Sequence, residues 1–301
     1  MKSLSYHIFR ALMKLSKATY DCDAPLEKQR LLVEKNAGFI KAPENLAVER
    51  TTVGGVPGEW LRMPGVDETR VLLHFHGGGY CMGSCTTNRA MVARLAAACG
   101  VKAFLPDYRL APEHAFPAPV EDALAVYRGL LEERIPSKNI LISGDSAGGG
   151  LALATLVSLR DGKEPLPSAA ILFSPWTDLA LTGSSLTSRS KADPWLFPRI
   201  AEIQARRYCG DNDPRNPLIS PLYADLQGLP PLLVQVGEDE ILLSDSTRLA
   251  ESAREAGVDV CLDVWPGMWH VWQCLAPKMP EATRAIEAAG RYARNVATFS
   301  L

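Results

Sequence analysis

Apolar residues along this chain form short continuous runs that alternate with longer amphipathic stretches. The runs predict eight strands, at 46–53, 58–62, 71–75, 101–105, 139–143, 168–173, 231–236 and 259–264. The amphipathic stretches predict helices at 86–99, 119–133, 147–160, 245–256 and 280–297. The middle runs are apolar throughout, as strands are when helices cover both faces of a parallel sheet. This alternation predicts an α/β protein with a doubly wound, mostly parallel sheet of eight strands.

Two parts of the chain stand outside this alternation. Helical patterns at 4–20 and 25–38 precede the first strand, and residues 176–222 contain no good strand. A stretch of that length usually covers or forms a site. We expect residues 1–40 and 176–222 to be helical cap elements on a single domain that spans residues 1–301. The expected cap contains six large apolar side chains: Phe9, Met13, Trp176, Trp195, Leu196 and Phe197.

Composition excludes several classes of protein. The 301 residues are 47% hydrophobic and the formal net charge is −2, so nothing indicates nucleic-acid binding. The seven cysteines form no C-x-x-C pair, which is typical of reduced thiols. We expect no metal and no organic cofactor.

The N-terminal sequence does not resemble a signal peptide, because basic residues interrupt every apolar run. No run reaches the roughly 18 apolar residues that a membrane span needs. No exposed apolar anchor is evident either. We therefore expect a cytoplasmic protein without stable membrane association.

The stretch Gly144-Asp145-Ser146-Ala147-Gly148 carries the clearest chemistry. It lies between a predicted buried strand and a predicted helix, and G-x-S-x-G in that context is the nucleophile elbow of an α/β hydrolase. Glycine leaves room for the tight turn, and the helix N-terminus favours developing negative charge. Ser146 is the predicted nucleophile.

A second motif, His76-Gly77-Gly78-Gly79, follows the 71–75 strand. Consecutive glycines expose backbone N–H groups, and an HGGG loop supplies part of the oxyanion hole in lipases and esterases. An ordinary glycine-rich turn would explain this motif if it stood alone. Its position ahead of a nucleophile elbow favours the oxyanion hole.

The base can be found by elimination. The chain has five histidines, His7, His74, His76, His114 and His270, and only the last follows Ser146. In this fold the order is serine, acid, histidine. His270 also lies in a loop after the last strand, so it is the predicted base. His114 could line the pocket, although a structural or surface position is the simpler interpretation.

The acid must follow a strand between the serine and the histidine. Three acidic residues, Glu238, Asp239 and Glu240, come directly after the 231–236 strand. Spacing alone does not choose among them.

Several motifs together resemble the bacterial hormone-sensitive-lipase-like esterases of the α/β-hydrolase fold. The matching blocks are His76–Tyr80 with Gly83-Ser84, Asp107–His114 with Phe116–Ala118, Gly144–Gly149, Ser174–Leu179 and Asp193-Pro194. The resemblance covers most of the chain. It implies the α/β-hydrolase fold and carboxylesterase activity on small-molecule esters.

The resemblance also implies roles for residues. Its register favours Glu240 as the acid, because Leu242 and Asp245 follow at the family's spacing. The family usually has Asp-Pro where this chain has Glu240-Ile241, which keeps Asp239 open. The backbone N–H groups of Gly77, Gly78, Gly79 and Ala147 would form the oxyanion hole. We expect four residues to contact substrate: Tyr80, Asp145, Trp176 and Trp195. Relatives often pair through an edge strand, here 259–264, which makes a homodimer plausible.

The predicted reaction is hydrolysis of short- to medium-chain esters through an acyl-enzyme. Two alternatives stay open. One is amide hydrolysis by an arylformamidase- or peptidase-like enzyme on the same fold, since the triad is shared. The other is a non-catalytic small-molecule receptor, which typically lacks a triad member, whereas this chain has all three.

Overall fold

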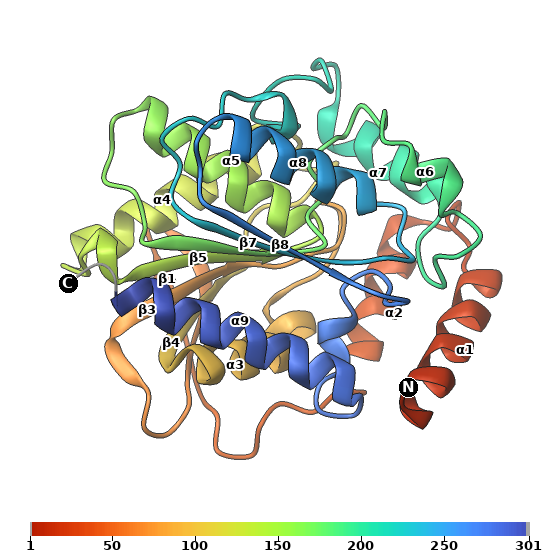
Figure 1. Cartoon of the computed structure of the whole chain (residues 1–301), viewed down its shortest axis with the longest axis horizontal. Coiled ribbons are helices and arrows are strands. Elements are labelled where there is room, and N and C mark those ends of the chain that lie inside the picture. The colour runs from red at the N-terminus through yellow and green to blue at the C-terminus, as the bar shows by residue number, and fades with distance from the viewer. Residues whose placement is uncertain (1, 299–301) are drawn as a thin grey trace.

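The computed structural model describes residues 2–298 and is built around one eight-stranded sheet (Figure 1). The strands are β1 Ala47–Val53, β2 Val56–Arg62, β3 Asp67–Phe75, β4 Val101–Pro106, β5 Ile140–Asp145, β6 Ala169–Phe173, β7 Leu232–Gly237 and β8 Val260–Trp265. Their order is β1-β2-β4-β3-β5-β6-β7-β8. The pairs β1–β2 and β2–β4 are antiparallel, and all other pairs are parallel. The predicted strands and the mostly parallel sheet are confirmed.

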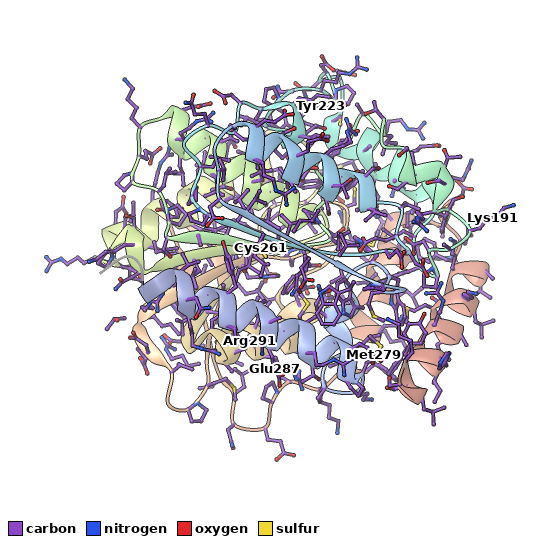
Figure 2. The ribbon with its side chains drawn as sticks, viewed as in Figure 1. Lys191, Tyr223, Cys261, Met279, Glu287 and Arg291 are labelled. Carbon is purple, nitrogen blue, oxygen red and sulfur yellow. The ribbon has the colours of Figure 1, made fainter. Side chains whose placement is uncertain are left out.

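Helices cover both faces of the sheet (Figure 1). One face carries α3 Cys85–Cys99 and α9 Pro280–Thr298, and the other carries α4 Ala118–Glu132, α5 Ala147–Asp161 and α8 Leu243–Glu255. Each face has its own cluster of buried apolar side chains. The α9 helix shows the division clearly, because Ala285 and Ala289 are buried while Glu287 and Arg291 point outward (Figure 2).

The centre of the sheet packs closely against α5. All six residues of β5 are buried, and α5 opens with Ala147 and three glycines. A Cβ on Gly144 would collide with the Gly148 carbonyl, and one on Gly148 would collide with the Phe75 carbonyl. Small residues therefore let α5 approach β3 and β5 closely, directly after the predicted nucleophile.

Four helices gather at one end of the sheet (Figure 1): α1 Leu4–Thr19, α2 Leu26–Ala37, α6 Ser185–Ser188 and α7 Pro198–Cys209. The first two match the helices predicted for the cap. The segment 176–222 contains no strand among its described residues, as expected, but α6 and α7 were not predicted individually. Three short 3₁₀ helices complete the fold, η1 Ser137–Asn139, η2 Pro221–Tyr223 and η3 Trp272–Leu275.

The N-terminal helix α1 is held by partners distant in the sequence. The Ser3 hydroxyl, which also caps α1, donates to Glu281 at the start of α9 (2.7 Å). Arg10 donates to the Gly267 carbonyl and to the Asp239 carboxylate (3.0 and 2.7 Å). These contacts hold one side of α1 against the loops at the end of the sheet.

The other side of α1 contradicts the expectation that no apolar anchor is exposed. Leu4, Ile8, Leu12 and Leu15 are all exposed, so the chain does present an apolar surface. The sequence pattern concealed this because α1 is apolar on two sides, and only one of them is buried. In residues 2–298, no helix combines the length and apolar character needed to cross a membrane.

Candidate active site

Ser146 stands at a strained turn between β5 and α5. Its backbone has φ 54° and ψ −122°, a conformation that residues with a side chain rarely adopt. The Ser146 N–H donates to the Phe173 carbonyl (2.9 Å), and its carbonyl accepts from the Trp176 N–H (2.9 Å). Bonds to β6 and to the segment after it thus hold the strained turn.

The glycine loop lies beside Ser146 and is braced from beneath. The His76 ring is buried and stacks on Tyr108, with ring centroids 4.3 Å apart. The Tyr108 hydroxyl donates to the His76 carbonyl (2.7 Å). Burial lowers the pKa of His76, which keeps this ring neutral. His76 therefore supports the loop from a position outside the cavity.

The backbone N–H groups of the glycine loop differ in availability. The Gly77 N–H donates to the Asp145 carboxylate (3.1 Å) and is already occupied. Within residues 2–298, the N–H groups of Gly78 and Gly79 have no hydrogen-bond acceptor. Ala147 is the first residue of α5, so its N–H has no acceptor within the helix. Three N–H groups near Ser146 are therefore free to bind an oxygen atom.

Glu240 and His270 are in direct contact. His270 Nδ1 lies 2.9 Å from Glu240 Oε2, and both residues are buried. The other carboxylate oxygen accepts from the Ser174 hydroxyl (2.9 Å) and from the Gly237 N–H. These donors hold the carboxylate in a fixed orientation with Oε2 facing His270 Nδ1. We therefore assign the proton of the neutral ring to Nδ1, which leaves Nε2 free.

The other two acidic residues after β7 have different partners. Asp239 pairs with Arg10 (2.7 Å), and Glu238 accepts from the Gly267 N–H (3.0 Å). Neither shows a contact with the imidazole of His270 among the described residues. The geometry therefore favours Glu240 as the acid on grounds that spacing could not provide.

A cavity of about 360 Å³ lies above these residues, within the size range of ligand sites. Ser146 and His270 both border it, together with side chains from α1, α2 and α7. Among residues 2–298 no hydrogen bond joins the Ser146 hydroxyl to His270. Loose contact between nucleophile and base is common in the absence of substrate.

The expected cap residues meet around the cavity with one exception. Met13, Trp176, Trp195, Leu196 and Phe197 all line it. Phe9 does not; it is buried beneath α1 and contacts Phe39 edge to face. Residues from both predicted cap segments thus cover the cavity, although the cap boundaries stay a prediction.

Two of the four expected substrate contacts lie in the cavity wall without another strong partner. These are Trp176 and Trp195, and the Trp195 ring meets His270 edge to face at 6.0 Å. Asp145 also borders the cavity, but its Oδ1 accepts from His74, Gly77 and Asn88. Asp145 is therefore engaged in holding the glycine loop.

Tyr80 lies elsewhere, contrary to expectation. It is 1% exposed, stacks on Tyr208 with centroids 3.7 Å apart, and is not part of the cavity lining. Its place directly after the glycine loop suggested contact, but the chain turns there and carries its ring into the core. His114, the other open candidate, is exposed and also lies outside the lining.

Sequence reasoning missed several residues that organise the site. Lys17 donates to three carbonyls of the cap, those of Ser190, Asp193 and Leu196. The Asp193 carboxylate accepts from the N–H of Ile241, next to Glu240 (3.0 Å). Only a matched Asp-Pro block pointed toward Asp193, and no sequence signal identified Lys17.

Comparisons with known proteins agree with this geometry. A family described as alpha/beta hydrolase fold matches residues 72–274. An acetyl-hydrolase from Streptomyces hygroscopicus is 42% identical over 98% of this chain and 97% of its own length. An esterase from Acinetobacter venetianus is 39% identical over 84% of both chains.

Solved structures give the same result. A crystal structure of an esterase from the bacterial hormone-sensitive lipase family superposes with a TM-score of 0.95 and 44% identity, covering 99% of both chains. A hormone-sensitive lipase from a metagenome library superposes with a TM-score of 0.94 and 36% identity, again over 99% of both chains. With this sheet, this elbow and these relatives, the chain belongs to the bacterial hormone-sensitive-lipase-like esterase family of the α/β-hydrolase fold.

Proposed function

We propose that this protein is a serine carboxylesterase that hydrolyses short- to medium-chain carboxylic esters through an acyl-enzyme. One observation carries the proposal: Ser146 and His270 border one cavity, and Glu240 bonds to His270 from behind it. The relatives named acetyl-hydrolase and esterase support ester hydrolysis as the reaction class.

In this mechanism His270 Nε2 accepts the proton of the Ser146 hydroxyl as its oxygen attacks the ester carbonyl carbon. The tetrahedral intermediate collapses, the bond to the alkoxy oxygen breaks, and His270 protonates the departing alcohol. Water then attacks the acyl-enzyme and gives one proton to His270. That proton returns to Ser146 as the carboxylic acid leaves. Glu240 stabilises the imidazolium formed in both halves of the cycle.

The free N–H groups of Gly78, Gly79 and Ala147 would donate hydrogen bonds to the negatively charged oxygen of each tetrahedral intermediate. Backbone donors held in place before the reaction stabilise charge without reorganisation, and each is typically worth about 3 kcal/mol in the transition state. The N-terminus of α5 adds its dipole. Because the Gly77 N–H already bonds to Asp145, we give Gly77 the role of fixing the loop.

The roofed cavity supports a preference for short acyl chains. Each CH₂ buried adds about 0.8 kcal/mol until the cavity is full, so activity should rise with acyl length and then fall. The family resemblance places the expected peak at roughly two to eight carbons. The test is a series of p-nitrophenyl esters from acetate to palmitate, measured as kcat/KM. A maximum at palmitate would overturn this assignment of the cavity.

Amide hydrolysis is distinguished in the same experiment. Formyl and peptide amides would be cleaved by the same triad as esters. Amides have poorer leaving groups, so comparing amides and esters of matched acyl length tests the reaction class directly. We expect kcat/KM for the ester to exceed that for the amide at every acyl length. The reverse order would favour the amidase alternative.

A further inference from the structure

Exposed large apolar side chains concentrate on the two N-terminal helices and the turn that follows them. Of ten such side chains in the described residues, seven lie between positions 4 and 39. They are Leu4, Ile8, Leu12, Leu15, Leu31, Leu32 and Phe39, and we call them the apolar face. Single exposed apolar residues are ordinary, but a large group on neighbouring helices marks an interaction surface.

Four of these residues form one stripe on α1. At about 100° per residue, Leu4, Ile8, Leu12 and Leu15 fall within an arc of about 80°. Leu4 is 77% exposed and Leu15 is 63% exposed, so the stripe is open along the whole helix. The opposite side of α1 is already docked. Core packing therefore does not explain the stripe.

Basic residues outnumber acidic residues around the apolar face. Residues 1–41 contain eight basic and four acidic residues, a formal charge of +4 in a chain whose net charge is −2. The α1 helix contains no acidic residue at all. Arg10 and Lys17 face the protein, whereas Lys14 is exposed beside the stripe. An apolar stripe flanked by basic residues is the pattern of helices that lie on anionic lipid.

The apolar face also adjoins the mouth of the cavity. Leu32 belongs to both, since it is 47% exposed and lines the cavity. Met13 of α1 and Val33 of α2 continue the lining inward. Figure 1 shows α1 at the edge of the molecule. A surface that covered the apolar face would meet the opening through which substrate passes.

We propose that the apolar face docks on an anionic lipid surface and turns the mouth of the cavity toward it. A second copy of this chain is the less suitable occupant, because symmetric pairing would place the basic helices against each other. Such pairing would also cover the mouth of the cavity. A lipid surface matches both the apolar stripe and its positive border.

The test measures co-sedimentation with vesicles, using the Ser146→Ala protein so that lipid hydrolysis plays no part. We expect binding to vesicles of phosphatidylcholine and phosphatidylglycerol in equal parts, and weaker binding to phosphatidylcholine alone. The variant Ile8→Gln/Leu15→Gln should reduce the partition coefficient by about tenfold or more. Neither residue lines the cavity. The control variant Val48→Gln/Val264→Gln replaces exposed apolar residues elsewhere and should bind as the parent does.

Three outcomes would overturn the proposal. They are no binding to anionic vesicles, equal losses in the two double variants, and sedimentation showing a dimer that only Ile8→Gln/Leu15→Gln dissociates. If that variant fails to fold by circular dichroism, Lys14→Glu replaces it and should weaken binding to anionic vesicles alone. Because binding is read without turnover, its failure would leave the proposed esterase activity untouched.

Discussion

The hydroxyl of Ser174 donates a 2.9 Å hydrogen bond to the carboxylate of Glu240. The Ser174 hydroxyl oxygen also accepts from the N–H of Val271, the residue after His270 (3.1 Å). One side chain at the end of β6 therefore ties the acid after β7 to the loop that carries the base. Ser174 has φ 45°, so the backbone is held in an unfavourable conformation where this link is made.

Replacing Ser174 by alanine should lower kcat by about tenfold with little change in KM, because the Glu240–His270 pair loses a fixing hydrogen bond. The measurement is steady-state hydrolysis of p-nitrophenyl acetate. Ser168→Ala is the matched control, since Ser168 precedes the other end of β6 and bonds only to the Ile140 carbonyl through its hydroxyl. Equal kcat values for the two variants would refute the positioning role of Ser174.

Substitutions at Ser146 should separate activity from stability. Both Ser146→Ala and Ser146→Gly should lose several orders of magnitude in kcat. Glycine also relieves the strained backbone, so Ser146→Gly should unfold about 2 °C above Ser146→Ala. Activity assays and calorimetry measure the two effects, and a serine-directed phosphonate should label only the unmodified protein. Labelling at another serine would remove Ser146 as the nucleophile.

Two neighbouring acidic residues should behave differently. Glu240→Gln should lower kcat by roughly 10²–10⁴ because it removes the charge that stabilises the imidazolium. Asp239→Asn should lower the free energy of unfolding by about 1–2 kcal/mol through loss of the Arg10 ion pair, with a far smaller effect on kcat. Kinetics and urea denaturation on both variants give the comparison. A larger loss of kcat in Asp239→Asn would reverse the assignment.

Lys17→Met should loosen the roof of the cavity. The ammonium group donates to three cap carbonyls at 2.7–2.8 Å, and methionine keeps the length but not the donors. We expect a loss of about 2 kcal/mol in the free energy of unfolding and a raised KM for short esters. Lys14→Met is the matched control, because Lys14 is exposed on the same helix. Similar losses in both variants would show that the three contacts do not anchor the cap.

Asp245 should make stability depend on pH. Burial raises its pKa from the ordinary 3.8 to about 8, so the folded protein holds a proton that the unfolded chain releases. The contribution of protonated Asp245 to the free energy of unfolding is fully present below pH 4 and is lost as the pH rises through 8. The free energy of unfolding falls by at most about 1.4 kcal/mol per pH unit in this interval.

Asp245→Asn should flatten this dependence, since an amide oxygen can still accept from the N–H groups of Thr177 and Asp178. Melting temperatures between pH 4 and pH 9 test it. The parent should lose stability faster than Asp245→Asn across that interval. Parallel curves would mean that Asp245 is ionised throughout.

The sheet was predictable because its central strands are apolar without interruption. Burial on both faces leaves no alternative for a run such as Ile140-Leu141-Ile142. The α7 helix was harder, because its four arginine and glutamate residues dilute the apolar pattern. Its packing depends on distant partners that no local pattern contains, such as Tyr80 and Phe116 against Tyr208.

The candidate triad was predictable for a different reason, since the fold fixes the order of serine, acid and histidine. The family register already favoured Glu240, but the partner that engages Asp239 could be found only in the fold, because Arg10 lies 229 positions away from that carboxylate. Tyr80 failed as a substrate contact because a positive φ of 59° turns the chain there. Such a turn cannot be read from residue types.

The bond between Ser3 and Glu281 spans 278 positions, so α1 docks on a helix that the ribosome makes much later. At about 5–20 residues per second, that interval lasts roughly 15–55 s. Throughout it, the nascent chain carries a helix that is apolar on both sides and has no docking site. The part of the cavity roof that α1 contributes can therefore be fixed in this way only after the chain has been made as far as α9.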